Sequence, residues 1–162
     1  MQEKLNKLME EITIEKSRES IKDYEFKGYK LLKNIIIPDK IKYIGEEAFS
    51  ECKWLHKIII PDSVIIIEKG CFSNCVSLTD VTLGTGLKII PENCFFGCKQ
   101  LETIKIRRHI KLIEKGAFLE SGLKEVILYP HDIIIEDGVF PPGCCVRRPH
   151  PPRISEEQDL YF

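Results

Sequence analysis

Five leucines recur along this chain at a nearly constant interval, and that interval constrains the fold more than any other feature. Leu32, Leu55, Leu78 and Leu101 are 23 residues apart, and a fifth copy begins at Leu123, one residue early. Each leucine opens the phrase Leu-x-x-Ile/Val-x-Ile/Leu, which an apolar run and a phenylalanine follow. A unit of this size cannot bury its own apolar side chains, so it must stack on its neighbours. The chain is therefore expected to form a solenoid of five coils.

Each repeat contains two apolar stretches that predict two short strands per coil. In the first stretch apolar residues alternate, which points them inward and leaves the residues between them outside. Pro38 and Pro61 close this strand in the first two repeats, because proline removes a donor from the strand ladder. The second stretch precedes a turn with a phenylalanine. Stacking in phase then predicts one internal file of rings: Phe49, Phe72, Phe95, Phe118 and Phe140.

Composition favours one packed domain and excludes several classes of partner. The 162-residue chain is 43% hydrophobic, which is enough for a continuous core. Its formal net charge is -1, so it lacks the strong positive field that attracts nucleic acid or acidic membranes. The N-terminus is polar, and no apolar stretch is long enough for a signal peptide or a membrane span. We expect a cytoplasmic protein that binds neither nucleic acid nor a membrane.

The two ends of the chain depart from the repeat. Residues 1–18 carry four apolar residues at the i, i+3, i+4, i+7 spacing of an amphipathic helix: Leu5, Leu8, Met9 and Ile12. This helix would cap the first coil, or bind a partner or a second copy. Residues 21–31 alternate apolar and polar and could form an atypical first strand. The predicted organisation is an N-terminal helix and cap at 1–31, the repeats at 32–145, and a proline-rich, then acidic tail at 146–162.

The repeats resemble a known family. Residues 55–75 read LHKIIIPDSVIIIEKGCFSNC, which is similar to the BspA-like leucine-rich-repeat unit Leu-x-x-Ile-x-Ile-Pro-x-x-Val-x-x-Ile-Gly-x-x-Ala-Phe-x-x-Cys. Residues 44–52 and 113–118 match the same turn, and the resemblance covers residues 32 to about 140. It implies an α/β fold, namely a right-handed solenoid with short parallel strands that recognises a protein or another ligand. Such repeats are often found in surface adhesins of bacteria and protists, which carry a secretion signal and an anchor that this sequence does not show.

Seven cysteines leave three alternatives: a disulfide framework, a metal site or buried thiols. The odd number, the missing leader and the core-sized chain favour reduced thiols. The spacing Cys71-x-x-x-Cys75 and Cys94-x-x-x-Cys98 could supply four thiolates to a structural zinc.

The repeat favours buried thiols, because free cysteine behaves as a small hydrophobic side chain. One repeat position holds Cys52, Cys75, Cys98 and Ser121, and another holds Ala48, Cys71, Cys94 and Ala117. We therefore expect no metal and no other cofactor. Cys144 and Cys145 lie outside the repeat phase and are the better candidates for a reactive thiol.

The sequence has no catalytic motif. The histidines lie at different repeat positions, so stacking does not gather them: His56, His109, His131 and His150. Gly84-Thr85-Gly86 lacks the helix and lysine of a phosphate-binding loop and predicts a turn. The chain is expected not to be an enzyme.

Partner recognition would use the side chains that the coils do not bury. The outward rung of the first strand is apolar at three of its five places, and exposed isoleucines in a row usually indicate an interface. The predicted partner-binding residues of this strand are Ile36, Lys57, Ile59, Asp80, Thr82, Glu102, Lys105 and Ile127.

The second strand carries an apolar ladder of Tyr43, Ile66, Ile89, Leu112 and Ile134. This ladder could be a second buried rung, a floor under the N-terminal helix, or a flat strip for another protein or another copy. Ile66 and Ile89 are the predicted partner contacts, and burial of several such side chains would contribute about 1.5 to 3 kcal/mol each.

The sequence thus predicts a non-enzymatic protein-interaction module with an unidentified protein partner. One alternative is a self-assembling structural protein, in which the apolar ladder joins copies into a homo-oligomer. Another is a surface adhesin-type ligand binder. The basic tail contains Pro149-x-x-Pro152, an incomplete match to the extended ligands of aromatic grooves, and a plain extension is the simpler interpretation.

Overall fold

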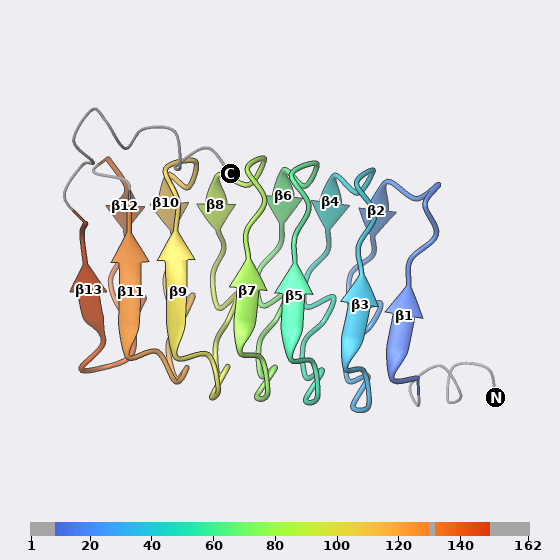
Figure 1. Cartoon of the computed structure of the whole chain (residues 1–162), viewed down its shortest axis with the longest axis horizontal. Helices are drawn as coiled ribbons and strands as arrows, with labels where there is room; N and C mark the ends of the chain where they lie inside the picture. Colours follow the sequence, from blue (N-terminus) through green and yellow to red (C-terminus); the bar gives the residue numbers. More distant parts are fainter. Residues whose placement is uncertain (1–8, 130–131, 150–162) are drawn as a thin grey trace.

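The computed structural model describes residues 9–129 and 132–149, and within them the chain has thirteen short strands and no helix (Figure 1). The strands alternate between two series. The first series comprises β1 (Glu11–Thr13), β3 (Asn34–Ile36), β5 (Lys57–Ile59), β7 (Asp80–Thr82), β9 (Thr103–Ile106), β11 (Glu125–Leu128) and β13 (Cys145–Arg147). The second comprises β2 (Ser20–Ile21), β4 (Tyr43–Ile44), β6 (Ile66–Ile67), β8 (Ile89–Ile90), β10 (Leu112–Ile113) and β12 (Ile134–Ile135).

All strand pairs are parallel, and their register repeats the period of the sequence. Ile12 pairs with Ile35, and Ile44 pairs with Ile67, each 23 residues further along the chain. The first series forms the sheets β1-β3, β5-β7 and β9-β11-β13, and the second forms β2-β4-β6 and β8-β10-β12. Parallel strands in this arrangement make a solenoid, as the repeat predicted.

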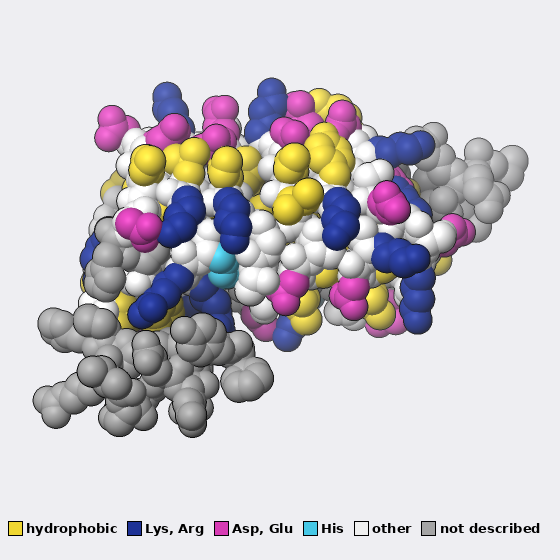
Figure 2. Space-filling model, turned by 90° about the horizontal axis from the view of Figure 1, so that it is seen from above, with side chains coloured by type: hydrophobic (Ala, Val, Ile, Leu, Met, Phe, Trp, Pro, Cys, Tyr) yellow, Lys and Arg dark blue, Asp and Glu magenta, His cyan; other side chains and the backbone are white. Residues whose placement is uncertain are grey.

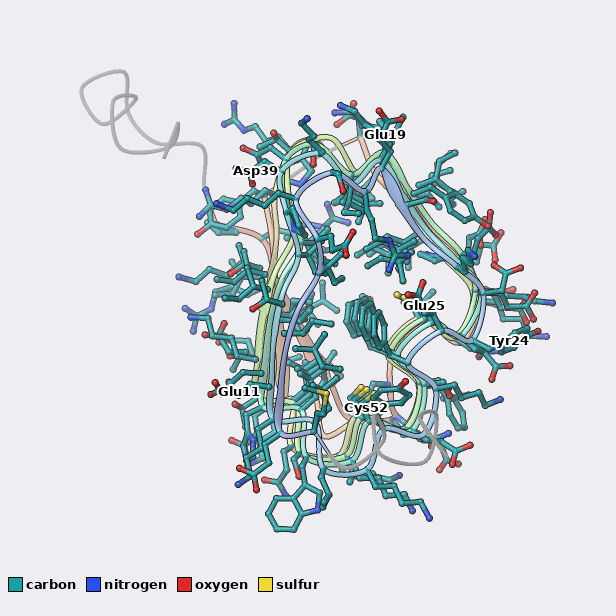
Figure 3. The ribbon with its side chains drawn as sticks, turned by 90° about the vertical axis from the view of Figure 1, so that its right-hand side faces the viewer. Glu11, Glu19, Tyr24, Glu25, Asp39 and Cys52 are labelled. Atoms are coloured by element: carbon teal, nitrogen blue, oxygen red, sulfur yellow. The ribbon has the colours of Figure 1, made fainter. Side chains whose placement is uncertain are left out.

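The predicted internal file of phenylalanine rings is confirmed. Phe49, Phe72, Phe95 and Phe118 are fully buried. Neighbouring rings stack with centroids between 5.2 and 5.8 Å apart, and Phe26 and Phe140 extend the file at its two ends. Figure 3 looks along the solenoid and shows the superimposed coils around this one stack of rings. Equivalent residues of all coils therefore lie in columns.

The predicted N-terminal helix is wrong for the described part of residues 1–18. Glu11–Thr13 is strand β1, which pairs with β3, and Ile14 lies in the core. Met9 and Ile12 fit a helical spacing, but a strand here satisfies the edge of β3, which a helix would leave unpaired. Leu5 and Leu8 lie outside the described residues.

Residues 9–31 form a further coil, so the solenoid has about six turns and not five. The predicted strand at 21–31 is limited to its first residue, because β2 ends at Ile21. Turns follow, with Tyr24 and Gly28 in the left-handed region at φ 58° and 70°, and Phe26 enters the ring file. Residues 9–14 read Met-Glu-Glu-Ile-Thr-Ile, which is the repeat phrase with methionine in the place of leucine, and this first coil keeps the interior of the others.

Candidate recognition surface

The solenoid presents two flat faces, one on each strand series. Within each strand one residue points into the core and its neighbours point outward, so each coil adds one outward rung to each face. We call these the first-strand face and the second-strand face. Parallel register places the outward side chains of paired strands in straight columns, and the separate sheets of each series lie side by side along the solenoid (Figure 1).

The second-strand face carries a continuous row of outward apolar side chains. Tyr43 pairs with Ile66 in register, and Leu112 pairs with both Ile89 and Ile134. The exposed fractions of the isoleucines are 48% for Ile66, 43% for Ile89 and 66% for Ile134, and Ile65 beside Ile66 is 57% exposed. We call these six residues the apolar strip: Tyr43, Ile65, Ile66, Ile89, Leu112 and Ile134.

The position of the strip bears on two of the alternatives that the sequence left open. The strip is not a second buried rung, because the inward residues of β6 and β8 are Ile67 and Ile90. Residues 9–18 do not form a helix over it, because this part of the expected N-terminal helix is not helical. No helix or strand among the described residues covers the strip, so its apolar side chains face outward.

Lysines border the strip along one side. Lys42, Lys88 and Lys111 occupy one exposed column, in which Ile65 stands between Lys42 and Lys88. The backbone N–H groups of Ile65 and Lys111 donate to the carbonyl oxygens of Lys42 and Lys88. Figure 2 shows the row of hydrophobic side chains with Lys and Arg side chains along one side of it. We call these three lysines the lysine edge.

The lysine edge keeps most of its charge available. The Lys111 ammonium pairs with Asp132 at 2.7 Å. The Lys88 ammonium donates only to the carbonyl oxygen of Thr85, at 3.0 Å. Lys42 and Lys88 have no carboxylate partner within the described part of the chain, so the edge is net positive.

The first-strand face is different, because its charged side chains pair with one another across neighbouring coils. Ion pairs join Lys57 to Asp80 at 3.1 Å, Lys124 to Glu102 at 2.6 Å and Arg147 to Glu125 at 3.0 Å. Three of the predicted partner-binding residues, Lys57, Asp80 and Glu102, are therefore already engaged within the solenoid.

The remaining predicted residues of the first-strand face lie where the pattern placed them. Ile36 and Ile59 are 63% and 52% exposed. Thr82 and Lys105 are also exposed and line a hollow of about 250 Å³ between β7 and β9, whereas Ile127 is half-buried. The apolar part of this face is shorter than the strip, because Thr82 and Lys105 interrupt its isoleucines.

Sequence reasoning missed one exposed aromatic side chain. Trp54, the chain's one tryptophan, is half-exposed, and its ring lies 6.5 Å from that of His56. It occupies a corner position where the neighbouring repeats have Leu31 and Ser77. A tryptophan outside the inward pattern was the available signal.

A second hollow, of about 350 Å³, lies on the turn side. Its lining includes Glu46, Glu47 and Glu92 together with Lys69, which pairs with Glu46 at 3.4 Å. Carboxylates dominate this lining, which therefore differs in charge from the lysine edge.

The repeat cysteines are packed in the core as thiols. The Cys52, Cys75 and Cys98 thiols donate to the carbonyl oxygens of Phe26, Phe49 and Phe72 at 3.2 to 3.3 Å. Burial raises the pKa of Cys52 and Cys98 to about 12, and it holds the pKa of Cys71, Cys75 and Cys94 well above the usual value. These thiols stay protonated at neutral pH, which opposes both nucleophilic and metal-binding roles.

The remaining candidate groups do not assemble into a site. Cys145 is exposed in β13 and Cys144 is half-buried beside it. Across residues 9–129 and 132–149, no three His, Cys, Asp or Glu side chains lie close enough together to hold a metal ion. A search of the same residues finds no helix with the length and apolar character needed to cross a bilayer.

Comparison with known families agrees with this geometry. The profile of the BspA type leucine rich repeat region matches residues 19–144 in six copies. The chain belongs to the BspA-type leucine-rich-repeat family. The match begins in the first coil, so the leucine-rich-repeat count agrees with the six turns of the structure.

Solved structures share this fold, and two of the three described here are of leucine-rich repeat proteins. A leucine-rich repeat protein from Bacteroides ovatus is 23% identical, with a TM-score of 0.64 over 82% of this chain and 46% of that one. The T. pallidum leucine rich repeat protein is 26% identical, with a TM-score of 0.69 over 74% and 58%. The pneumococcal vaccine antigen PcpA is 26% identical, with a TM-score of 0.67 over 80% and 31%.

The leucine-rich-repeat chain thus spans only about a third to three-fifths of the length of these three solved proteins. No curated protein matches the sequence. The comparisons therefore give the family and the fold, and the choice of a functional surface rests on the side chains described above.

Proposed function

We propose that this leucine-rich-repeat chain is a non-enzymatic protein-interaction module whose main contact surface is the apolar strip. One observation carries the proposal: Ile66, Ile89 and Ile134 are 43% to 66% exposed in one row, with Ile65 beside Ile66, and nothing among the described residues covers them. Apolar rows of this kind on a soluble protein usually mark an interface. Leucine-rich-repeat domains generally mediate protein interactions, which agrees with this surface.

The strip offers more binding free energy than the first-strand face. About half of each strip isoleucine remains to be buried, which is worth roughly 1 kcal/mol per side chain by area. On the first-strand face a partner would also have to displace or desolvate the pairs of Lys57 with Asp80 and of Lys124 with Glu102. That face, with Ile36, Ile59, Thr82, Lys105 and Ile127, stays a secondary candidate.

The double change Ile66→Asp with Ile89→Asp tests the proposal. We expect it to abolish partner binding, because two charges would enter the centre of an apolar contact. The circular dichroism melt should stay within a few degrees of the wild type, because both side chains face outward.

The matched control is Ile36→Asp with Ile59→Asp, which makes the same change on the other face. This control should retain binding. Loss of binding in the control with retention in the strip variant would move the interface to the first-strand face.

Self-assembly through the strip is the alternative from a different class. It predicts a wild-type oligomer that the strip variant dissociates. Light scattering across a concentration series separates the two possibilities, because a monodisperse monomer excludes obligate self-assembly.

Cytoplasmic location and reduced cysteines form a linked proposal, and a thiol titration of protein from its native source tests both. With the pKa of Cys52 and Cys98 near 12, buried thiols should react slowly with a thiol reagent at pH 8, and all seven should react after unfolding. A total below seven after unfolding would indicate oxidised cysteines, as expected for an exported adhesin.

A further inference from the structure

The dimensions of the apolar strip favour one kind of occupant. Its main row runs over five successive coils, from Tyr43 to Ile134. Paired strands in it are about 4.8 Å apart, and β6 lies beside β8 without pairing, so the row is about 19 Å long. An α-helix repeats its apolar stripe once per turn, about every 5.4 Å. An extended strand repeats the same side only every 6.7 Å or so.

A helix therefore keeps its apolar stripe in step with the strip much better than a strand does. Over four coil-to-coil intervals, the positions of the helix turns and of the strip residues come to differ by about 2.4 Å, which is less than half a helix turn. For a strand laid along the same row, the difference reaches about 7.6 Å, which is more than the spacing between two coils. About 13 residues of helix, at 1.5 Å per residue, cover the whole strip.

The lysine edge adds a requirement for charge. Lys42 and Lys88 lack carboxylate partners among the described residues, and they run parallel to the row of isoleucines. A helix seated on the strip would place one of its flanks beside these ammonium groups. Acidic side chains on that flank would be attracted, and basic ones would be repelled.

We propose that the apolar strip binds an amphipathic helix of a partner protein, about 13 residues long, whose apolar stripe is bordered on one side by Asp or Glu. This inference rests on the proposed function, because it names the partner class of the same strip. The apolar stripe covers Ile66, Ile89 and Leu112, and the acidic flank pairs with Lys42 and Lys88. Turning such a helix end for end exchanges its two flanks, so the flank that carries the acids determines the direction in which the helix lies along the strip.

Fluorescence anisotropy with labelled peptides and the full chain tests the inference. The first probe is a 15-residue helical peptide with leucines at i, i+3, i+7, i+10 and i+14, glutamates along one flank, and alanine and glutamine elsewhere. The second replaces the glutamates with lysines. The third is an alternating Val/Glu peptide that favours an extended strand.

We expect the acidic helix to bind about tenfold more tightly than the lysine helix and the extended peptide, with an affinity that falls as salt is raised. Lys42→Glu with Lys88→Glu should reverse the preference, so that the lysine helix binds better. The control Lys105→Glu, on the first-strand face, should change neither affinity by more than about twofold.

Other results separate this inference from the proposed function. Equal binding of both helices, lost in the Ile66→Asp, Ile89→Asp variant, would overturn the charge requirement and leave the strip as the interface. Tighter binding of the extended peptide would overturn the helix. Binding that this variant retains would overturn the strip itself. A wild-type dimer that the variant dissociates would make a second copy the occupant and would overturn the helix inference.

Discussion

The two flat faces of the solenoid come from the same repeat, yet their outward side chains differ in whether they pair with those of the neighbouring coil. On the first-strand face, Lys57 faces Asp80 and Glu102 faces Lys124, so neighbouring coils satisfy one another. On the second-strand face, Ile66 and Ile89 repeat the same exposed apolar side chain, and none of the described residues covers them. The period places equivalent residues in columns. The residue type in each column determines whether the outward side chains pair within the solenoid or stay exposed to another molecule.

The largest expected effect is the difference in stability between substitutions on the second-strand face and substitutions in the core directly beneath it. Ile66 and Ile67 are adjacent in β6, but Ile66 is 48% exposed and Ile67 only 5%. Ile67→Asp should lower the free energy of unfolding by about 3 to 5 kcal/mol or prevent folding, because it buries an unpaired charge. Ile66→Asp should cost less than about 1 kcal/mol.

Urea denaturation of the two variants measures this difference. Ile89→Asp and Ile90→Asp repeat the test one coil further along, where Ile89 is 43% exposed and Ile90 fully buried. Similar losses for both members of a pair would mean that the apolar strip is core and would remove the contrast between the faces.

A smaller effect is expected on the turn side, where the residue type conflicts with the backbone. Glu51 has φ 61°, a left-handed conformation that costs a residue with a Cβ about 1 to 2 kcal/mol. Gly97 has φ 69° two coils further along. Glu51→Gly should therefore raise the free energy of unfolding by about 0.5 to 1 kcal/mol, after the greater freedom of glycine in the unfolded chain is subtracted.

The reverse change, Gly97→Ala, is the control for the turn. It should lower the free energy of unfolding by about 1 to 2 kcal/mol for two reasons. An alanine at this φ is strained, and its Cβ would lie only 2.5 Å from the Asn74 Oδ1 atom. Thermal unfolding of both variants gives the comparison. No gain in Glu51→Gly would show that this glutamate contributes contacts that offset its backbone strain.

The smallest effect is expected on the first-strand face itself. Lys57 and Asp80 are both more than half-exposed, so their pair should contribute less than about 0.5 kcal/mol to stability. A double-mutant cycle with Lys57→Ala and Asp80→Ala measures that coupling. A coupling above about 1 kcal/mol would mean that the pairs of this face hold the coils together and do more than complete their charges.

The repeat predicted the interior of the fold well. Columns of leucine, isoleucine and phenylalanine follow directly from the 23-residue interval, and the ring file from Phe49 to Phe118 confirms them. The first coil was missed because methionine replaces the leucine that opens the other repeats, so Met9-x-x-Ile12-x-Ile14 was not aligned with them. Ile12 finds its partner Ile35 through the stacking of coils, whereas the local spacing of Met9 and Ile12 equally suits a helix.

The candidate site was harder to predict for a related reason. Residues 65–67 are three consecutive isoleucines, so they lack the alternation that separates inward from outward side chains. The exposed fractions show that Ile67 points inward and that Ile66 does not, and β6 pairs with β4 so that these residues lie beside Ile44 and Tyr43. The charge of the lysine edge also depends on space, since it follows from carboxylates that neighbouring coils do or do not supply.

Because each coil is nearly a translated copy of the one before it, the length of the molecule is a countable property. Removal or duplication of one complete unit, such as residues 55–77, should yield a shorter or longer rod with intact joints. Each added unit would lengthen the exposed row by about 4.8 Å. Duplication of whole units would thus change the length of this protein in evolution without changing the packing between neighbouring coils.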